Sequence, residues 1–432
     1  MNKLQPKYRC PSCWVEFRPE ETLWIATSEE LGDDPQLEPT RFENYKSRLL
    51  RFLPEHFTPY YKALDDHKKP CLYLACPYCH LEFPKSYLES KSFMTSIVGG
   101  QGTGKTWFLV SLVWWIQRNF STFALKFSNP FADLNGQMND WIERFFPSQT
   151  DRQKSDAIPP SPEAANSVDV LLPNLYDKTK SDYTLSKLIQ PYMYSFNRWD
   201  DNQLYSLCLY DHAGEDFTTQ VGDERKHLTK HLGFHDTLFF LFDPTQNLKF
   251  IEEYKRYQKE KELLGAEKNT TKAVAMTTRN DPVNIFTEMA QRIKEEYVKK
   301  DGTRLFGAEL YDHPVVIVVP KCDEWQSLLD EKYRKLLQTD PIDNVEGKGA
   351  LVKKTIMEVS NAVRLLLRNY RPDFVDAVEG FASDVIFIPV SATGRNPDKD
   401  DTFRPGTLSP IWIGVPLLYA LARHEAKLVN MI

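Results

Sequence analysis

Residues 92–106 read SFMTSIVGGQGTGKT, and this stretch decides the fold. A short apolar run at residues 93–98 meets a glycine-rich string that matches G-x-x-x-x-G-K-[ST] from Gly99 to Thr106. An apolar helical pattern, WFLVSLVW at residues 107–114, follows at once. Strand, loop and helix in this order are the context that a phosphate-binding loop (P-loop) requires, which disfavours an ordinary glycine-rich turn.

The parts of this loop have separate physical roles. The predicted phosphate contacts are Gly99, Gly100, Gln101, Gly102, Thr103, Gly104, Lys105 and Thr106. Glycines let backbone N–H groups converge on phosphate oxygens because no Cβ blocks the approach, and the helix N-terminus adds partial positive charge. Lys105 is predicted to reach the β- and γ-phosphates and to assist catalysis, while Thr106 is predicted to hold Mg²⁺.

The bulk properties are those of a water-soluble protein with room for more than one domain. The chain has 432 residues, of which 41% are hydrophobic, so two domains with a full core are expected. A net charge of −6 gives no overall basic field for nucleic acid or anionic lipid, although local basic patches leave nucleic acid undetermined. The N-terminus lacks an apolar signal region, and the apolar runs are too short to cross a bilayer. We therefore expect a cytoplasmic protein without a membrane span.

Four of the seven cysteines form two C-P-x-C pairs, and each pair is the pattern of a zinc knuckle. The expected zinc ligands are Cys10, Cys13, Cys76 and Cys79. Two knuckles complete the tetrahedral four-thiolate set that structural Zn²⁺ prefers, and an odd cysteine count without a secretion signal argues against disulfides. Cys71 and His80 are alternative ligands that would break the symmetry of the knuckles. The pattern predicts a zinc-ribbon domain in residues 1–91 that contains a helical insert.

From residue 92 onward, short apolar runs alternate with helical patterns. The strands expected are residues 93–98, 123–127, 204–210, 237–242, 315–319 and 385–389. Because helices lie between them, the fold class expected for residues 92–432 is α/β, with a mostly parallel P-loop sheet flanked by helices. Inserts are expected at residues 129–183 and at the charged, partly helical residues 249–304, and residues 339–349 read as a loop.

The run LYSLCLYD places an acid at the end of a buried-looking strand. This acid, Asp211, is the predicted second Mg²⁺ residue, usually acting through water. It also begins the D-x-x-G pattern of GTPases, in which the backbone N–H of Gly214 would sense the γ-phosphate. Gly214 is therefore assigned, with Lys105, to catalysis.

Two further strand ends carry residues suited to a guanine base. In PKCD, Asp323 would accept hydrogen bonds from guanine N1–H and the exocyclic amine, and the Lys321 stem would pack over the ring. The later strand continues into the predicted guanine contacts Ser391, Ala392 and Thr393. Adenine lacks the matching donors, so this pair of loops favours GTP over ATP. All of these motifs follow strands, and ligands of open α/β sheets bind at the carboxyl ends of the strands.

With these motifs in order, residues 92–396 resemble the Ras-like (TRAFAC-class) branch of P-loop GTPases. The large inserts and the cysteine-rich front resemble, in overall layout, the bacterial double-GTPase family of GTPase-associated conflict and anti-phage defence systems. The resemblance implies GTP and GDP as ligands, Mg²⁺ as cofactor, and protein partners such as an activator, an effector or another GTPase.

Four positions depart from the family pattern. Pro320 stands where the family has Asn or Thr, so a contact that ties this loop to the P-loop is lost. Thr393 replaces the usual Lys, and Gln101 replaces a glycine of small GTPases. Glu215 replaces the glutamine that orients the attacking water, so the resemblance also assigns Glu215 to catalysis. We therefore expect slow intrinsic hydrolysis that a partner raises, for example by supplying an Arg.

The switch I threonine, which should contact Mg²⁺ and the γ-phosphate, is the least legible feature. It must lie between Thr106 and Asp211, and the candidates are Thr184 and Thr179, each of which also reads as an ordinary loop residue. Three functions stay open from the sequence. They are a GTP-dependent switch, an ATPase of another P-loop class, and a scaffold that nucleotide stabilises and that recognises partners through its zinc ribbon.

Overall fold

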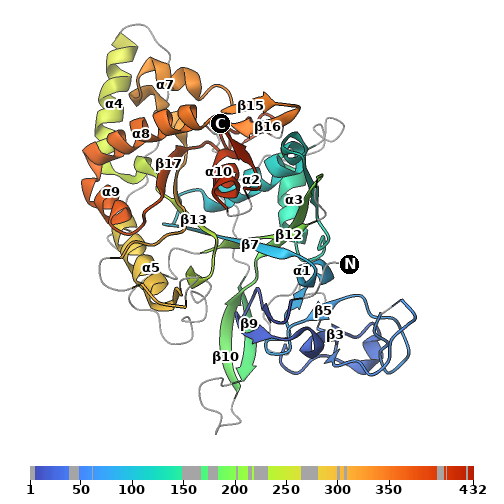
Figure 1. The fold of residues 1–432 in the computed structure, drawn as a ribbon. Helices are drawn as coiled ribbons and strands as arrows, with labels where there is room; N and C mark the ends of the chain where they lie inside the picture. The colour runs from blue at the N-terminus through green and yellow to red at the C-terminus, as the bar shows by residue number, and fades with distance from the viewer. Residues whose placement is uncertain are drawn as a thin grey trace.

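The computed structural model describes residues 5–37, 48–60, 62–147, 167–173, 183–200, 203–212, 217, 232–263, 281–298, 302–305, 309–396, 403–404, 406–424 and 427–432. Its main body is a seven-stranded sheet of order β17-β14-β13-β7-β12-β11-β8 (Figure 1). Its strands are β7 (Lys91–Gly99), β8 (Leu125–Ser128), β11 (Tyr192–Arg198), β12 (Leu204–Asp211), β13 (Thr237–Leu241), β14 (Val315–Val319) and β17 (Val385–Pro389). β12, β7, β13, β14 and β17 pair in parallel, whereas β11 is antiparallel to its neighbours β12 and β8. The expected mostly parallel α/β sheet is therefore confirmed.

Helices flank both faces of this sheet. They are α2 (Lys105–Asn119), α3 (Gly136–Phe145), α4 (Leu248–Leu263), α5 (Pro282–Glu296), α6 (Cys322–Trp325), α7 (Glu331–Leu336), α8 (Lys353–Tyr370), α9 (Pro372–Glu379) and α10 (Val415–Arg423). Successive residues of β13 show the two faces, because side chains alternate along a strand. Phe239 meets Phe108 of α2 with ring centroids 6.1 Å apart, whereas Phe240 meets Phe286 of α5 at 5.2 Å. Within the described residues, no helix is both long enough and apolar enough to cross a membrane.

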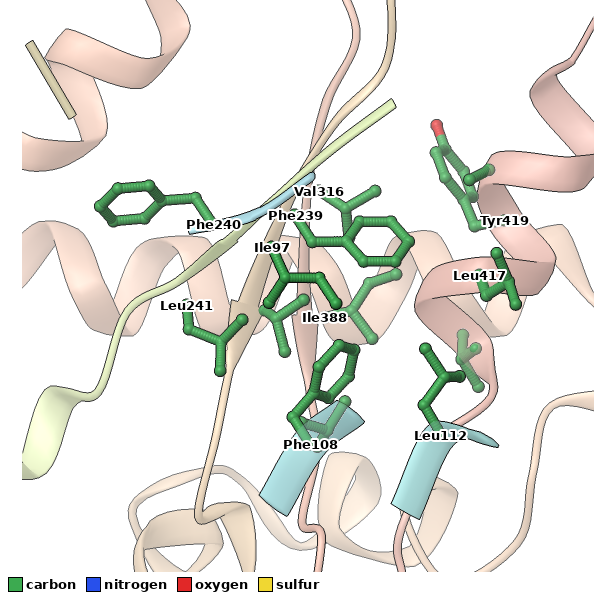
Figure 2. Packing of buried hydrophobic residues seen from close by; sticks show 14 of the residues in the cluster. Ile97, Phe108, Leu112, Phe239, Phe240, Leu241, Val316, Ile388, Leu417 and Tyr419 are labelled. Atoms are coloured by element: carbon green, nitrogen blue, oxygen red, sulfur yellow. The ribbon is translucent and has the colours of Figure 1, made fainter. Parts of the chain in front are cut away.

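The core lies where these helices pack on the central strands. Figure 2 shows Ile97 and Phe239 of the sheet facing Phe108 of α2, with Leu417 of α10 beside them. These four side chains are at most 1% exposed. Because burial of a large apolar side chain contributes about 1.5–3 kcal/mol, this layer fixes the strands as one rigid platform. The platform in turn positions the loops at the strand ends.

Two expectations about strands and loops need correction. The strand expected at residues 123–127 begins at Leu125, because Phe120–Phe123 forms a 3₁₀ turn that ends at Ala124 with φ 55°. Residues 339–349 were expected to be a loop, but they contain a hairpin of β15 (Ile342–Val345) and β16 (Lys348–Leu351). Its two turn residues have positive φ, as tight hairpins require. β16 also pairs with β18 (Asn430–Met431).

The front of the chain forms small sheets of very short strands. They are β1 (Tyr8–Arg9), β2 (Glu16–Phe17), β3 (Leu23–Ile25), β4 (Arg51–Phe52), β5 (Leu74–Ala75) and β6 (Glu82–Phe83), followed by helix α1 (Lys85–Leu88). The helical insert expected between the knuckles is wrong for the described residues 14–37, 48–60 and 62–75, which hold strands and 3₁₀ turns. Pairing of β4 with β3, followed by Pro54, draws this part of the insert into a sheet instead.

The first knuckle packs against the main sheet. Trp14 lies 5.4 Å from the Tyr210 ring of β12 and stacks on Phe234 at 6.0 Å between centroids. The Tyr210 hydroxyl donates a hydrogen bond of 2.7 Å to the Pro11 carbonyl. Strand register puts Tyr210 on the same face of the sheet as Phe240, which packs on α5. The front unit, by which we mean the described residues before β7, therefore covers the same face of the sheet as α5. The domain boundary expected after residue 91 stays a prediction.

Trp14→Ala is expected to lower the free energy of unfolding by about 3 kcal/mol, because it opens a cavity where the front unit meets the sheet. Trp14 is 7% exposed. Urea unfolding of the full chain measures the change, and Phe57→Ala at a half-exposed site of the front unit is the control. Equal losses in the two variants would contradict this account of the packing.

Candidate functional site

The carboxyl ends of the parallel strands gather the predicted site residues at one edge of the sheet. β7 ends at Gly99, β12 ends at Asp211, and β14 and β17 lead into Lys321 and Ser391. β7 lies between β12 and β13, so the chain moves to one side of β7 and then returns to the other. Such a switch in strand order opens the crevice in which α/β sheets bind ligands. The fold therefore places the P-loop at the position that suits a phosphate ligand.

The P-loop is already folded around the ammonium group of Lys105. Gly102 and Gly104 have φ of 72° and 86°, a conformation that side chains strain, and Gly104 directly precedes α2. A Cβ on Gly99 would lie 2.8 Å from the Leu241 carbonyl of β13, so only glycine fits there. The Lys105 ammonium donates 2.8 Å hydrogen bonds to the carbonyls of Gly99 and Gly100. The positive charge of Lys105 thus lies within the loop itself.

The Thr103 hydroxyl also donates to the Gly100 carbonyl, at 2.9 Å. On the neighbouring strand, Asp211 pairs with Ile97 of β7, which puts its carboxylate beside the strand that leads into the P-loop. His212 is fully buried, and its backbone N–H donates to the Ile97 carbonyl at 3.1 Å. Burial, together with the Lys105 charge, lowers the pKa of His212 to about 3. The imidazole therefore stays neutral beside the loop at physiological pH. The other two assigned catalytic residues, Gly214 and Glu215, lie outside the described residues.

The two predicted base-binding loops meet each other. Asp323 lies in the first turn of α6, and the backbone N–H of its neighbour Cys322 donates a 3.0 Å hydrogen bond to the carbonyl of Val390, next to Ser391. Burial raises the pKa of Asp323, and the nearby Ser391 hydroxyl opposes that rise. The Ser391 hydroxyl also accepts a 2.7 Å hydrogen bond from the Gly394 backbone N–H. The loops of the acid and the serine that the sequence assigned to guanine are thus neighbours.

The second base loop is tied to the P-loop helix. The Ser111 hydroxyl of α2 donates to the Ala392 carbonyl at 2.9 Å, and the Thr393 hydroxyl donates to the Arg395 carbonyl at the same distance. Gly394 has φ of 70° and a neighbouring Ser409 carbonyl so close that a Cβ would clash. No sequence signal marked Ser111, because a serine inside an apolar helix is typical of a tolerated core residue.

Lys321 forms an ion pair that sequence reasoning missed. Its ammonium lies 2.6 Å from Oδ2 of Asp243, which follows β13. Burial alone would lower the pKa of Lys321, but the Asp243 charge more than offsets this and the pKa is raised, so the ammonium stays charged. Lys321 also has φ of 58°, a strained value at the turn into α6. The available signal for Asp243 was the one used for Asp211, namely an acid directly after a buried apolar run.

The switch I candidates are not brought to this edge by the described structure. Thr184 lies in β10 (Tyr183–Ile189), which pairs with β9 (Ser167–Pro173) in a separate two-stranded antiparallel sheet. Its partner in the register is Leu172. Thr179 lies outside the described residues. The assignment of Thr184 to Mg²⁺ stays a prediction.

The four knuckle cysteines converge as expected. The Sγ atoms of Cys10, Cys13, Cys76 and Cys79 lie within 4.8 Å of one another, and all four side chains are buried. The distance is 3.7 Å both between Cys10 and Cys79 and between Cys13 and Cys76. Tetrahedral zinc with Zn–S bonds of about 2.3 Å requires sulfur atoms about 3.8 Å apart. The cluster therefore has the dimensions of a closed four-thiolate metal site.

The two knuckles repeat the same backbone turn. Cys10 N–H donates to the Val15 carbonyl and Trp14 N–H to the Cys10 carbonyl, at 3.0 and 3.1 Å. In the second knuckle, Cys76 and His80 make the corresponding bonds, each 3.0 Å long. Trp14 and His80 both have positive φ. Backbone N–H groups of the turns also point at sulfur, as from Ser12 to Cys10 Sγ at 3.3 Å. This symmetry explains why C-P-x-C pairs alone predicted the cluster.

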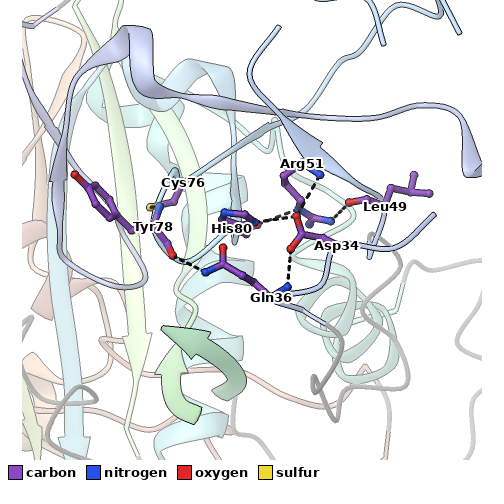
Figure 3. Close-up of polar contacts among 7 residues, drawn as sticks. All are labelled: Asp34, Gln36, Leu49, Arg51, Cys76, Tyr78 and His80. Carbon is purple, nitrogen blue, oxygen red and sulfur yellow. Dashed lines mark hydrogen bonds and ion pairs between the residues drawn. The ribbon is translucent and has the colours of Figure 1, made fainter. Parts of the chain in front are cut away.

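The alternative ligands lie outside the cluster. Figure 3 shows His80 directed at Asp34, whose Oδ2 lies 2.8 Å from His80 Nδ1, while the Arg51 guanidinium donates to the His80 carbonyl. The Cys71 thiol instead donates to the Lys69 carbonyl at 3.7 Å. His80 therefore helps to brace the second knuckle through Asp34 and Arg51.

Comparisons with known proteins give distant similarities. No protein-family model matches the chain. A protein of Mycolicibacterium smegmatis named as an ESX-1 scaffolding and assembly protein, SaeC, is 22% identical over 253 residues. The match covers 55% of this chain and 57% of that protein, so the chain spans little more than half of that relative. The solved cytosolic domain of the T. maritima FeoB iron transporter, in its apo form, aligns with a TM-score of 0.21 and 9% identity over 57% of this chain and 54% of that chain.

Glu324, beside Asp323, is expected to make the stability of the folded protein depend on pH. Burial, with the charges of Asp323 and Asp243, raises its pKa from 4.5 to about 7, although Lys321 opposes the rise. The folded state therefore binds a proton that the unfolded state releases, and stability falls as pH rises through this range. Glu324→Gln removes the effect, so its unfolding free energy relative to the native chain should increase by about 2 kcal/mol between pH 5 and pH 8.

Urea unfolding at pH 5 and pH 8 measures this difference. The exposed Glu331→Gln variant, whose side chain is 69% exposed, serves as the matched control and should show no such pH dependence. If Glu324→Gln changed the unfolding free energy by the same amount at both pH values, the pKa of Glu324 would not be raised by its surroundings.

Proposed function

We propose that the protein binds Mg²⁺–GTP at the carboxyl edge of the sheet and acts as a slow GTPase switch. The observation that carries this proposal is the meeting of the loop that holds Asp323 with the loop that holds Ser391, through the Cys322–Val390 backbone hydrogen bond, at the same strand ends as Lys105. A carboxylate held in a half-buried place beside a hydroxyl is a group that guanine would satisfy and adenine would leave unpaired. A P-loop alone would leave the base undefined.

In this proposal, each residue of the edge has one task. Lys105 and the backbone N–H groups of residues 99–106 bind the phosphates, and Thr106 with Asp211 would hold Mg²⁺. When bound, Mg²⁺ would neutralise charge on the β- and γ-phosphates. Gly214 is assigned to sensing the γ-phosphate and Glu215 to orienting water. Because Glu215 is an anion, we expect slow hydrolysis that an activating partner raises.

Asp323→Asn tests the base assignment. The variant loses the acceptor for the guanine amino group but gains an amide donor that suits the oxygen of xanthine. We expect GTP affinity to fall at least tenfold and affinity for xanthosine triphosphate to rise, as measured by competition against a fluorescent nucleotide. Asp330→Asn, an exposed acid nearby, is the control and should bind GTP as the native chain does. Unchanged GTP preference in Asp323→Asn would overturn the proposal.

A second candidate function is a nucleotide-stabilised scaffold. The similarity to a protein named for scaffolding and assembly favours it, and so does the front unit packed on the strand that ends in Asp211. The two candidates differ in turnover. A switch hydrolyses GTP and releases GDP, alone or with its partner, whereas a scaffold keeps its nucleotide unchanged. A place in a bacterial conflict system stays a prediction of the family resemblance.

We also propose that the four-cysteine cluster holds one structural Zn²⁺. Four thiolates close the coordination shell, so such a metal contributes folding energy rather than catalysis. Burial raises the pKa of the Cys13 and Cys79 thiols well above their ordinary range, and a bound divalent cation would supply the charge that four thiolates need.

Elemental analysis of protein prepared without chelators is expected to give about one zinc per chain. Cys76→Ser should lose the metal and unfold at a lower temperature, because the second knuckle would lose a ligand. Cys71→Ser is the matched control, since its thiol lies outside the cluster and it should retain the metal. Native protein free of zinc, or full zinc content in Cys76→Ser, would refute the assignment.

A further inference from the structure

The departure at Pro320 raises a structural question. Proline there offers no side-chain amide, so the direct tie between the base loop and the P-loop that the GTPase resemblance implies is missing. In this chain, a short turn lies between the two loops. It comprises Asp243 and the 3₁₀ turn Pro244–Gln246, and it follows β13, which lies between β7 and β14 in the sheet. We call it the DPTQ turn.

One end of the DPTQ turn holds the base loop. The Asp243 side chain is fully buried, and its Oδ2 lies 2.6 Å from the Lys321 ammonium. Its other oxygen, Oδ1, accepts hydrogen bonds from the Thr245 backbone N–H at 2.9 Å and from the Thr245 hydroxyl at 2.6 Å. Because both oxygens are engaged, the carboxylate is fixed in one orientation toward Lys321. An ion pair whose carboxylate is buried and held by these extra hydrogen bonds has a geometry that fixes the position of its partner.

The other end of the turn touches the P-loop. The Gln246 side-chain amide donates a 3.0 Å hydrogen bond to the carbonyl of Gln101, and a Cβ on Gly102 would lie 3.4 Å from the same nitrogen. The Gln246 backbone N–H donates to the Asp243 carbonyl at 3.2 Å, which closes the turn. The first and last residues of this four-residue turn therefore contact the base loop and the P-loop, respectively.

We propose that the DPTQ turn is a positioning element that couples the base loop to the P-loop, and that Asp243 thereby determines base selectivity. The inference rests on the proposed GTP site and names a determinant that the motifs do not contain. Asp243 holds Lys321 in its strained turn, and that turn sets the start of α6, which carries Asp323. Gln246 acts on the phosphate side, where its side-chain amide donates to the Gln101 carbonyl.

The two ends of the turn predict different effects. Asp243→Asn keeps the shape but removes the charge that holds Lys321, so GTP affinity should fall at least tenfold while ATP affinity changes less than twofold. Gln246→Ala removes a P-loop contact, so GTP and ATP affinities should fall together by a few fold. A merely structural role of the turn would lower stability without moving the ratio of GTP to ATP affinity.

Fluorescent GTP and ATP are titrated against the full chain and its variants with Mg²⁺, and thermal unfolding without nucleotide reports folding. Asp384→Asn is the matched control, because it breaks an ion pair of 2.7 Å with Arg423. Asp384 precedes β17, so it lies at the amino ends of the strands, away from the candidate site at their carboxyl ends. This control should leave the affinity ratio unchanged. If Asp243→Asn does not fold, Thr245→Val is the alternative, because it removes only the hydroxyl that donates to the Asp243 carboxylate. Thr245→Val should lower the ratio of GTP to ATP affinity about threefold.

Two outcomes would count against different claims. A native chain without GTP preference would remove the proposed function itself. A native chain that prefers GTP, with folded Asp243→Asn or Thr245→Val keeping the native affinity ratio, would overturn the DPTQ turn as a selectivity element and leave the proposed function standing.

Discussion

The candidate site depends on the parallel pairing of β7 with β12 on one side and with β13 on the other. This pairing aligns Asp211 with Ile97 and Leu241 with Gly99, so the strand ends that carry charge arrive together at the P-loop. A slip of one residue would turn Asp211 to the opposite face of the sheet. The approach of β13 is so close that Gly99 tolerates no side chain. The buried aromatic layer on both faces holds this register in place.

The central strands could be predicted because they are buried on both faces. Residues 315–319 and 385–389 match β14 and β17 fully, since continuous β-branched runs leave little choice of structure. The β15–β16 hairpin escaped prediction because its exposed residues carry no apolar pattern and its turn is set by backbone conformation. In the front unit, the knuckles were readable from spacing, but the insert was misread as helical because its strands form through pairing with distant residues.

The residues of the candidate site also fall into a group that the sequence predicts and a group that only the fold brings together. Lys105, Asp323 and Ser391 belong to motifs with fixed spacing, and a backbone hydrogen bond from Cys322 to Val390 joins the loops of the last two. The contacts of Asp243 and Ser111 are tertiary, since they join segments that are far apart in the chain, and no local pattern encodes them. The front unit adds a further connection, because the Tyr210 hydroxyl binds the first knuckle one residue before Asp211. The four-cysteine cluster and the strand ends of the candidate site are thus joined through a single strand.

The most direct measurement of the central claim is a crystal structure of the full chain with Mg²⁺ and a non-hydrolysable GTP analogue. We expect the triphosphate to lie within the loop of residues 99–106, with the Lys105 ammonium in contact with oxygens of the β- and γ-phosphates. We also expect the guanine ring against Asp323 and beside Lys321. A triphosphate bound in that loop with its base turned away from Asp323, or an analogue bound elsewhere on the protein, would contradict the account.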